Sequence, residues 1–336
     1  MAWYSIADRI EKIGVGSFND FDCSKYAGFT SKQLQMCKDY PEAMYGLLNG
    51  IKRAADQCQK QFHGEIWDCK GQAGFGVDIG KEATREASFV YAIVSASVSQ
   101  SISKACRAGI IPDCGCGELP RGSIEDTFQW SGCADNVRFS NYFTKRFLDS
   151  PDKMTKSAGS LMNRHNSQAG RKAVLASMVT KCKCHGIFGL CYSKTCYKVT
   201  GTLDDISSSL KSRYEEAKRV IATRYFDDLF PYRERERREL YFGKGERSIV
   251  KSTRNSRRSS LRMDELVFLE DSYGHCSPTA STGRVCTERT CPKMCCGKGW
   301  TTTIQTVKVS CNCQFVYCCD VKCDQCEQQI TKHTCN

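Results

Sequence analysis

The sequence predicts an α+β fold, in which a helical N-terminal domain precedes a small cysteine-rich C-terminal domain of β-hairpins. Apolar residues recur at helical spacing in the first part of the 336-residue chain. Twelve of the 24 cysteines lie in the 60 residues from 276 to 335. A basic stretch separates the two regions. We therefore expect a helical domain over 1–228, a basic linker over 229–263 and a cysteine-rich domain over 264–336.

Four stretches of the N-terminal domain each carry one apolar stripe, which predicts helices over residues 41–62, 81–108, 160–181 and 203–225. The second stretch ends at Gly109, and glycine favours the left-handed conformation that follows many helices. The fourth stretch is charged on one face, with Leu210, Tyr214 and Ile221 on the other. We interpret all four stripes as the core of this domain.

The C-terminal cysteines are too dense for a conventional apolar core, so this segment must be cross-linked or metallated. A zinc site would use Cys182-x-Cys184-His185 or Cys323-x-x-Cys326, with His333 as a further ligand. However, the adjacent pairs Cys295-Cys296 and Cys318-Cys319 suit tetrahedral coordination poorly, and the chain has only five histidines. We therefore favour disulfides, in which twelve bridges would use every cysteine.

Several cysteines fit nested rungs of a β-hairpin, because antiparallel partners share a nearly constant sum of residue numbers. This holds for Cys311 with Cys326, Cys313 with Cys323, Cys318 with Cys319, and for Cys184–Cys191 inside Cys182–Cys196. Cys323 and Cys326 differ in parity, so we expect a β-bulge between them. Each native bridge contributes about 2–5 kcal/mol, so such a ladder could replace the missing core.

Disulfides on this scale require an oxidising compartment, so we expect a secreted protein of the extracellular space or matrix. The first residues contain no apolar stretch typical of a secretory leader, and we interpret the given chain as lacking its signal peptide. The longest weakly polar run, residues 87–98, is too short for a membrane-spanning helix.

Residues 232–262 carry eleven Lys or Arg against four Glu, which supplies seven of the twelve net positive charges of the chain. One interpretation is a solvated tether between the domains. The other is a contact with a polyanion, a sulfated glycosaminoglycan such as heparan sulfate, through Arg254, Arg257, Arg258 and Arg262. The redox compartment disfavours nucleic acid as the partner.

Several spaced motifs together point to one family. They are Glu65-Ile66-Trp67-Asp68-Cys69, Cys114-Gly115-Cys116, Trp130-Ser131-Gly132-Cys133-Ala134-Asp135, His165-Asn166, Ala169-Gly170-Arg171-Lys172-Ala173-Val174, Cys182-Lys183-Cys184-His185-Gly186, Gly283-Arg284-Val285-Cys286, Cys295-Cys296-Gly297-Lys298-Gly299 and Cys311-Asn312-Cys313-Gln314-Phe315-Val316-Tyr317-Cys318-Cys319. Over essentially the whole chain, this set resembles the Wnt family of secreted signalling ligands.

The resemblance implies protruding, disulfide-closed hairpins on the helical domain and long hairpins in the C-terminal domain. It also implies a disulfide pairing: Cys58 with Cys69, Cys106 with Cys114, Cys116 with Cys133, Cys182 with Cys196, Cys184 with Cys191, Cys276 with Cys296, Cys286 with Cys291, Cys295 with Cys335, Cys311 with Cys326, Cys313 with Cys323, and Cys318 with Cys319. Cys23 and Cys37 are then left to pair with each other.

Wnt-like ligands grip the cysteine-rich domain of Frizzled receptors with two hairpins, and then recruit co-receptors of the low-density-lipoprotein-receptor-related class. The resemblance places the first contact at the tip formed by His185, Gly186, Ile187, Phe188, Gly189 and Leu190. It places the second at Phe315, Val316, Tyr317, Cys318, Cys319, Asp320 and Val321. It implies neither a cofactor nor an enzymatic activity.

The first tip departs from the family pattern Cys-His-Gly-x-Ser-Gly-Ser-Cys, whose serine carries a fatty acid. Phe188 stands at the acylation position and has no hydroxyl to esterify. We therefore expect a non-acylated ligand whose tip acts as a small apolar anchor. There are two alternatives to this expectation. Ser193 could carry the fatty acid instead, or the tip could pack against the protein itself.

Two other functions remain open at this point. One is a secreted decoy that binds the receptor without recruiting the co-receptor. The other is a thiol or zinc enzyme that uses Cys184 with His185, or the Cys323-x-x-Cys326 pair. Adjacent residues of a strand point to opposite faces, which arranges Cys184 and His185 badly for nucleophilic catalysis.

Overall fold

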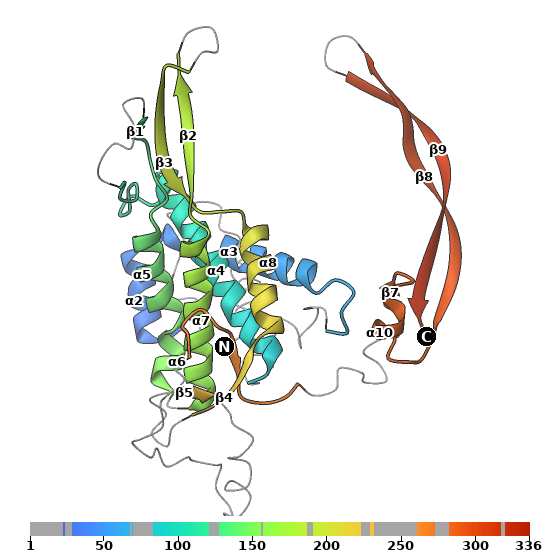
Figure 1. Ribbon diagram of the computed structural model, residues 1–336, viewed down its shortest axis with the longest axis horizontal. Coiled ribbons are helices and arrows are strands. Elements are labelled where there is room, and N and C mark those ends of the chain that lie inside the picture. The colour runs from blue at the N-terminus through green and yellow to red at the C-terminus, as the bar shows by residue number, and fades with distance from the viewer. Residues whose placement is uncertain are drawn as a thin grey trace, which may run out of the picture. The chain divides into compact units, whose positions relative to one another are not determined.

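The computed structural model describes residues 23, 29–67, 69, 83–120, 128–155, 157–186, 191–222, 229–231, 261–272, 282–316 and 320–336 (Figure 1). The chain divides into two compact units. The first, called the helical unit here, comprises Met1–Gln61 and Cys69–Ser272, and the second, the C-terminal unit, comprises Phe62–Asp68 and Tyr273–Asn336.

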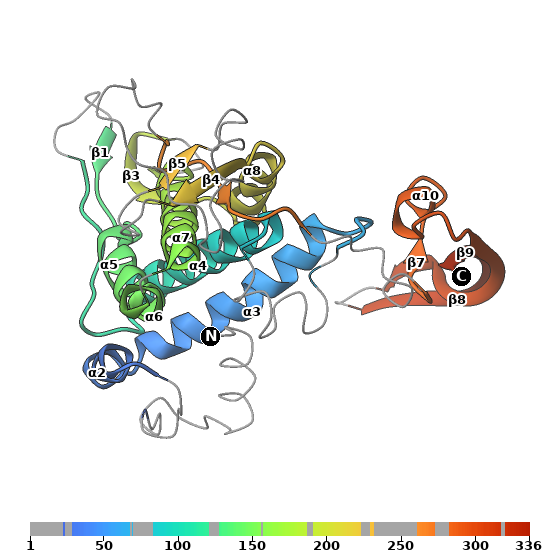
Figure 2. The same cartoon turned by 90° about the horizontal axis from the view of Figure 1, so that it is seen from below.

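The helical unit is built around one long buried helix, α4 (Arg85–Arg107). Four helices pack against it: α3 (Ala43–Gln61), α5 (Val137–Leu148), α7 (Ala158–Ala176) and α8 (Leu203–Glu215). The shorter helices α2 (Ser31–Asp39) and α6 (Ser150–Met154) pack on α5 (Figure 2). Because α4 is surrounded, nearly all of its side chains are buried, including its serines.

Close approach of the helices to α4 depends on two glycines. A Cβ atom on Gly50 of α3 would lie 2.5 Å from the Cα of Val98, and one on Gly170 of α7 would lie 2.0 Å from the carbonyl oxygen of Ala92. Real Cβ atoms do not approach so closely, so any side chain at these positions would push α3 or α7 away from α4. Gly170 belongs to one of the motifs quoted above.

The first two predicted helices are confirmed, with ends that differ by a few residues. Gly109 has φ +72°, as expected after the end of α4. The other two predicted helices end early. The third stops at Ala176, and the fourth stops at Glu215 rather than continuing to residue 225.

The fourth helix ends where the chain forms strand β4 (Lys218–Ala222). This strand lies between β5 (Leu229–Pro231) and β6 (Val267–Phe268). Its partner in β6 comes from about 50 residues later in the chain and pairs Lys218 with Val267. The local spacing of apolar residues predicts a helix here, whereas the strand depends on pairing with β6, which is distant in the sequence.

The boundary of the C-terminal unit differs from the prediction. Residues 264–272, predicted to begin the cysteine-rich domain, belong to the helical unit. Asn166 of α7 holds β6 there, since its side-chain amide donates to the carbonyl oxygen of Val267 and accepts from the Val267 amide, both at 2.9 Å. Leu266 and Val267 are fully buried.

The C-terminal unit consists of two long strands and a small base. The strands β8 (Trp300–Val316) and β9 (Asp320–Cys335) form an antiparallel ribbon, and β7 (Val285–Cys286) pairs with the end of β9. The short helix α10 (Cys291–Met294) completes the base. The pairing of β8 with β9 runs without interruption over most of both strands, which confirms the long hairpin that the resemblance implies for this domain.

Among the helices that the structure describes, none is long and apolar enough to cross a membrane.

Candidate functional site

The first candidate hairpin is formed by β2 (Val179–His185) and β3 (Ser193–Val199), with β1 (Phe128–Trp130) parallel to β3. It projects beyond the helices of its unit (Figure 1). Every residue of β2 is exposed, and Cys182 lies directly opposite Cys196, to which it is bonded. β2 therefore presents its whole length to solvent, whereas Cys196 and Val199 of β3 are buried, and two disulfides join the strands.

Asp135 anchors the base of this hairpin. It is buried, and one carboxylate oxygen accepts hydrogen bonds of 2.7 Å from both the amide and the hydroxyl of Thr200, just after β3. The other oxygen lies 2.9 Å from the guanidinium of Arg107 at the end of α4. In addition, the Asp135 amide donates to the carbonyl oxygen of Lys198. These contacts fix β3 to the helical bundle.

The tip of the first hairpin is closed by a second disulfide, Cys184–Cys191. His185 and Gly186, two of the predicted contact residues, are exposed. The His185 ring lies 2.6 Å from the hydroxyl of Thr195, across the hairpin. The other four predicted residues, Ile187, Phe188, Gly189 and Leu190, lie outside the described residues.

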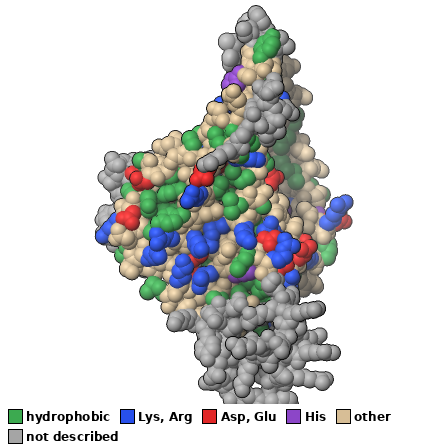
Figure 3. All heavy atoms as spheres, turned by 60° about the vertical axis from the view of Figure 1, so that its left-hand side comes forward, with side chains coloured by type: hydrophobic (Ala, Val, Ile, Leu, Met, Phe, Trp, Pro, Cys, Tyr) green, Lys and Arg blue, Asp and Glu red, His purple; other side chains and the backbone are tan. Residues whose placement is uncertain are grey.

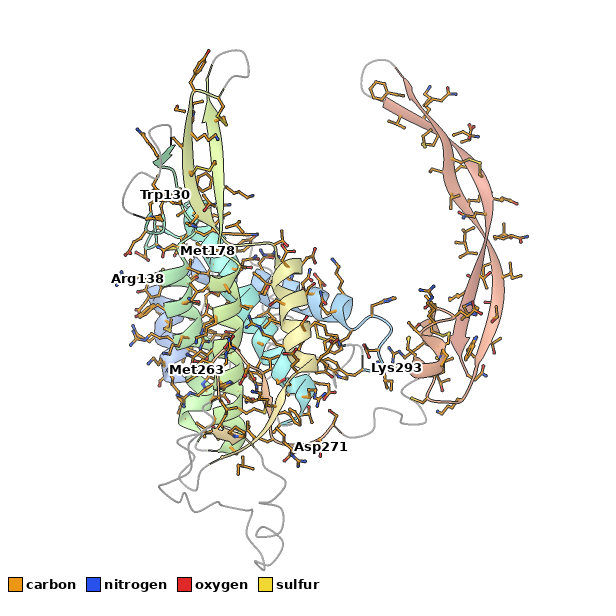
Figure 4. All side chains as sticks on the ribbon, in the orientation of Figure 1. Trp130, Arg138, Met178, Met263, Asp271 and Lys293 are labelled. Carbon is orange, nitrogen blue, oxygen red and sulfur yellow. A yellow bond between two sulfur atoms is a disulfide. The ribbon has the colours of Figure 1, made fainter. Side chains whose placement is uncertain are left out.

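Two features of the first hairpin were not among the predicted site residues. Tyr192 is 65% exposed beside the tip. Lys181, Lys183 and Lys194 are exposed on the strands, and the ammonium of Lys198 lies 5.5 Å from the centre of the Trp130 ring near the base (Figure 4). Residues 179–203 contain no Asp or Glu, and this is the signal in the sequence that indicates a basic surface.

The second candidate hairpin is the outer end of the β8–β9 ribbon, braced by the disulfides Cys311–Cys326 and Cys313–Cys323. Its irregularity lies between Cys311 and Gln314 of β8, not between Cys323 and Cys326 of β9 as expected. Asn312 has φ +48° there, a conformation that asparagine adopts more readily than most residues. The difference in parity requires one extra residue, but it does not determine which strand contains it.

At the tip of the second hairpin, Phe315 lies directly opposite Val321. Their side chains are 74% and 56% exposed, so they form an apolar pair in contact with water. Val316 pairs with Asp320 in the backbone ladder. Tyr317, Cys318 and Cys319 lie outside the described residues.

Every cysteine that the structure describes is in a disulfide. Ten of the pairs expected from the sequence are present, including Cys23–Cys37. Cys296 is also bonded, and its expected partner Cys276 lies outside the described residues. The sulfur atoms of Cys286, Cys291 and Cys295 lie within 4.8 Å of one another, but all three are in disulfides.

These bonds decide against the zinc and thiol alternatives at the positions considered. A zinc ligand or a catalytic nucleophile has to be a thiolate. Cys182, Cys184, Cys323 and Cys326 are each bonded to another sulfur. Neither proposed ligand set, nor the Cys184–His185 pair, offers a free thiol.

Of the four arginines predicted to form the polyanion site, the structure describes only Arg262. The guanidinium of Arg262 is largely exposed, and it forms an ion pair with Asp264 at 3.0 Å. Its backbone amide donates to the carboxylate of Glu265. Arg254, Arg257 and Arg258 lie outside the described residues.

Comparison with known proteins gives consistent matches over nearly the whole chain. The sequence model of the Wnt family matches residues 25–336. Protein mom-2 of Caenorhabditis elegans is 35% identical, over 99% of this chain and 93% of its own length. Protein Wnt-2b of Homo sapiens is 33% identical, over 93% of this chain and 79% of its own length.

A solved structure matches in the same way. A chain in the structure of human WLS in complex with WNT8A superposes with a TM-score of 0.62 and 32% sequence identity. The match covers 91% of this chain and 98% of that chain.

Proposed function

This chain belongs to the Wnt family of signalling ligands, and we propose that it binds the cysteine-rich domain of a Frizzled receptor with two hairpins, without a fatty acid on the first. Wnt family proteins are secreted ligands rather than enzymes. The proposal therefore concerns the extracellular contact that starts signalling, and it names the tips of β2–β3 and β8–β9 as the surfaces that make this contact.

The observation that carries the proposal is the exposed apolar pair of Phe315 and Val321 on a disulfide-braced tip. An apolar pair at the end of a two-stranded ribbon gains nothing for folding, whereas burial against a partner would remove it from water. The Cys313–Cys323 bond lies just below it and holds the two strands together. Such preorganisation lowers the entropy lost when a partner binds.

Chemistry at position 188 supports the absence of the fatty acid. An ester requires a hydroxyl, and phenylalanine has none. At about 0.8 kcal/mol per buried CH₂, a sixteen-carbon chain could contribute on the order of 10 kcal/mol before costs. Burial of one Phe side chain contributes only roughly 1.5–3 kcal/mol. The second hairpin must therefore supply a larger share of the affinity than in an acylated ligand.

The remaining partners follow from the family and from charge. A co-receptor of the low-density-lipoprotein-receptor-related class would be recruited after the Frizzled contact. Heparan sulfate would concentrate the ligand at cell surfaces, since the chain carries a net charge of +12. The first hairpin, which has lysines and no acidic residue, would favour an acidic surface on its partner.

Mass spectrometry of the secreted protein tests the absence of acylation. The peptide that contains residues 185–196 should have its unmodified mass. A fatty acyl group on Ser193, which is exposed at the start of β3, would contradict this part of the proposal.

Titration against isolated Frizzled cysteine-rich domains tests the two-hairpin contact. Phe315→Ala should weaken binding by about 1–2 kcal/mol, or roughly five- to thirtyfold, because it removes an apolar anchor. Phe188→Ala should weaken it less. Ile304→Ala is the matched control, since Ile304 is also on β8 and is 68% exposed, but lies far from the tip.

Equal affinity of Phe315→Ala and the parent protein would exclude the second hairpin as the main contact. A parallel signalling assay separates an agonist from a decoy, because a decoy would bind the receptor domain and give no signal.

A further inference from the structure

Four cationic side chains of the helical unit, each from a different helix, lie close enough for the charges of three to act on the fourth, Lys153. They are Lys32 of α2, Lys145 of α5, Lys153 of α6 and Arg164 of α7, and we call them the helical basic cluster. The three lysines are exposed and Arg164 is partly exposed. None of them is part of the two hairpins or of the linker.

Hydrogen bonds between the helices hold the cluster together. The hydroxyls of Thr30, two residues before Lys32, and of Ser150 at the start of α6 are 2.8 Å apart. The Gln33 side chain, next to Lys32, donates to the carbonyl oxygen of Phe147 at 3.0 Å. The fold therefore keeps α2, α5 and α6 in fixed positions.

The fourth helix is tied to the others in the same way. The Asn163 amide, next to Arg164, donates to the carboxylate of Asp152 at 3.2 Å, which joins α7 to α6. As a result, the four cations stand on helices that are joined to one another by hydrogen bonds.

The positive charge of the cluster is not neutralised. Within the part of the chain that the structure describes, none of the four cations forms an ion pair. Desolvation is the main cause that lowers the pKa of Lys153. Among the neighbouring charges, Asp149 has the largest effect and opposes the shift, while Lys32, Arg164 and Lys145 each add to it. Like charges that are close enough to affect one another repel, and a bound anion would reduce this repulsion.

The two neighbouring carboxylates do not cancel the cluster. Asp149 is buried and forms a two-point ion pair with Arg171, at 3.0 and 3.1 Å. Asp152 is partly buried and bonded to Asn163. In Figure 3, which brings forward the side of the molecule that is at the left in Figure 1, Lys and Arg side chains form a band across the helical unit.

We propose that the helical basic cluster is a binding site for a sulfated glycosaminoglycan. Its cations are spread over the ends and faces of four helices, which suits an extended polyanion that passes across them better than one small anion. Three of the four are lysines, which act as point charges and do not need a fixed geometry to contact sulfates. The disulfides indicate an extracellular setting, where nucleic acid is not the relevant polyanion.

This inference rests on the heparan sulfate part of the proposed function and moves the site from the linker to the folded unit. The difference matters because helices that are held against one another can fix the orientation of the bound ligand.

Binding of a heparin-derived octasaccharide to the full-length chain at increasing NaCl concentration tests the site. Lys32→Gln, Lys145→Gln and Lys153→Gln are combined in one variant. The matched control combines Lys60→Gln, Lys211→Gln and Lys218→Gln, which removes the same charge from lysines that are already paired with Asp204, Glu215 and Glu265. A third variant combines Arg254→Gln, Arg257→Gln and Arg258→Gln in the linker.

The cluster variant should bind the octasaccharide roughly tenfold more weakly at physiological salt. The slope of log affinity against log NaCl concentration should become shallower by about 2 to 3, because fewer counterions are released when three cation contacts are lost. The control should change much less. Asp152→Asn should strengthen binding, because it removes a negative charge beside the cluster. Hyaluronan, which has carboxylates and no sulfates, should bind weakly to every form.

Equal losses in the cluster variant and the control would show that only net charge matters, and would overturn the site. A large loss in the linker variant alone would also overturn it and would leave the linker as the polyanion site. The cluster variant should keep its affinity for the Frizzled cysteine-rich domain, so failure of this inference is distinguishable from failure of the receptor proposal.

Discussion

The helical unit and the C-terminal unit achieve their shapes by different means. In the helical unit, large side chains such as Phe89, Ile93 and Phe143 are fully buried around α4. In the C-terminal unit, the buried cluster consists of four cysteines and Met294. Most of the residues along β8 and β9 are exposed on both faces of the ribbon. Both units contain disulfides, but the helical unit also has a large apolar core, whereas little besides the sulfur–sulfur bonds stabilises the C-terminal unit.

The comparison explains where exposed apolar residues can be placed. A ribbon that does not depend on its side chains for stability is free to carry Phe315 and Val321 at its tip. A helix of the bundle has no such freedom, because its apolar face is already used by the core. Disulfide bracing thus makes side chains available for a partner.

The largest contrast is expected between two phenylalanines. Phe143 is fully buried and stacked on Phe147, with ring centres 5.6 Å apart. Phe143→Ala should lower the free energy of unfolding of the helical unit by about 3–5 kcal/mol, because it leaves a cavity. Phe315→Ala should change stability by less than about 0.5 kcal/mol. Thermal unfolding followed by circular dichroism at 222 nm measures both.

Similar losses in the two phenylalanine variants would contradict the distinction between a packed and a braced unit.

The next largest effect concerns the disulfides. The Cys295–Cys335 bond spans 40 residues and both cysteines are buried in the small core of the C-terminal unit. Its removal by Cys295→Ser with Cys335→Ser should cost about 4 kcal/mol by the loop-entropy estimate. We expect this to unfold the C-terminal unit, since little else is buried there. Hydrogen exchange of residues 300–335 measures the loss.

The matched control is Cys106→Ser with Cys114→Ser, which opens a loop of 8 residues beside α4. It should cost about 2.5 kcal/mol by the same estimate. The helical unit should stay folded, because its apolar core remains. Loss of exchange protection throughout α4 would show that disulfides hold this unit as well.

The smallest effect concerns a carboxyl group within the helical unit. Desolvation raises the pKa of Asp152 from 3.8 to about 6. Below that pKa the folded state binds the proton more tightly than the unfolded state, so this group contributes stability at acidic pH that is lost as the pH rises through about 6. Asp152→Asn should therefore stabilise the helical unit at pH 7.5 by about 1–3 kcal/mol.

Melting temperatures of the Asp152→Asn variant and the parent chain between pH 4 and 8 measure this. The gain should shrink as the pH falls toward 4, where the parent carboxyl is protonated. A gain that is the same at every pH would mean that the charge of Asp152 is not the cause.

Several parts of the fold follow from local pattern. Two of the four predicted helices are confirmed near their predicted ends, because the apolar stripe of each faces the core. The helix α5 is absent from the predicted set, although it carries Phe143 and Phe147 at helical spacing. The predicted helix over 203–225 fails at β4, since Val220 and Ile221 fit a strand as well as a helix and a distant partner decides between them.

The sequence predicts where the two candidate hairpins lie, but not their detailed geometry. Cysteine spacing alone indicated both hairpins and their nested bonds. The position of the bulge, the pairing of Phe315 with Val321 and the role of Asp135 depended on the register and on the contacts of the folded chain. The helical basic cluster could not be found from spacing, because its members lie on four helices.

The sequence by itself determined the class of the protein: a helical part with a regular apolar pattern, a cysteine-rich part that must be cross-linked, and a first tip that has no hydroxyl at position 188. These properties depend on residue type and local spacing. The tertiary structure alone decided which cations lie together, which strand takes the extra residue and where β6 belongs. Each of these depends on residues that are distant in the chain and adjacent only after folding.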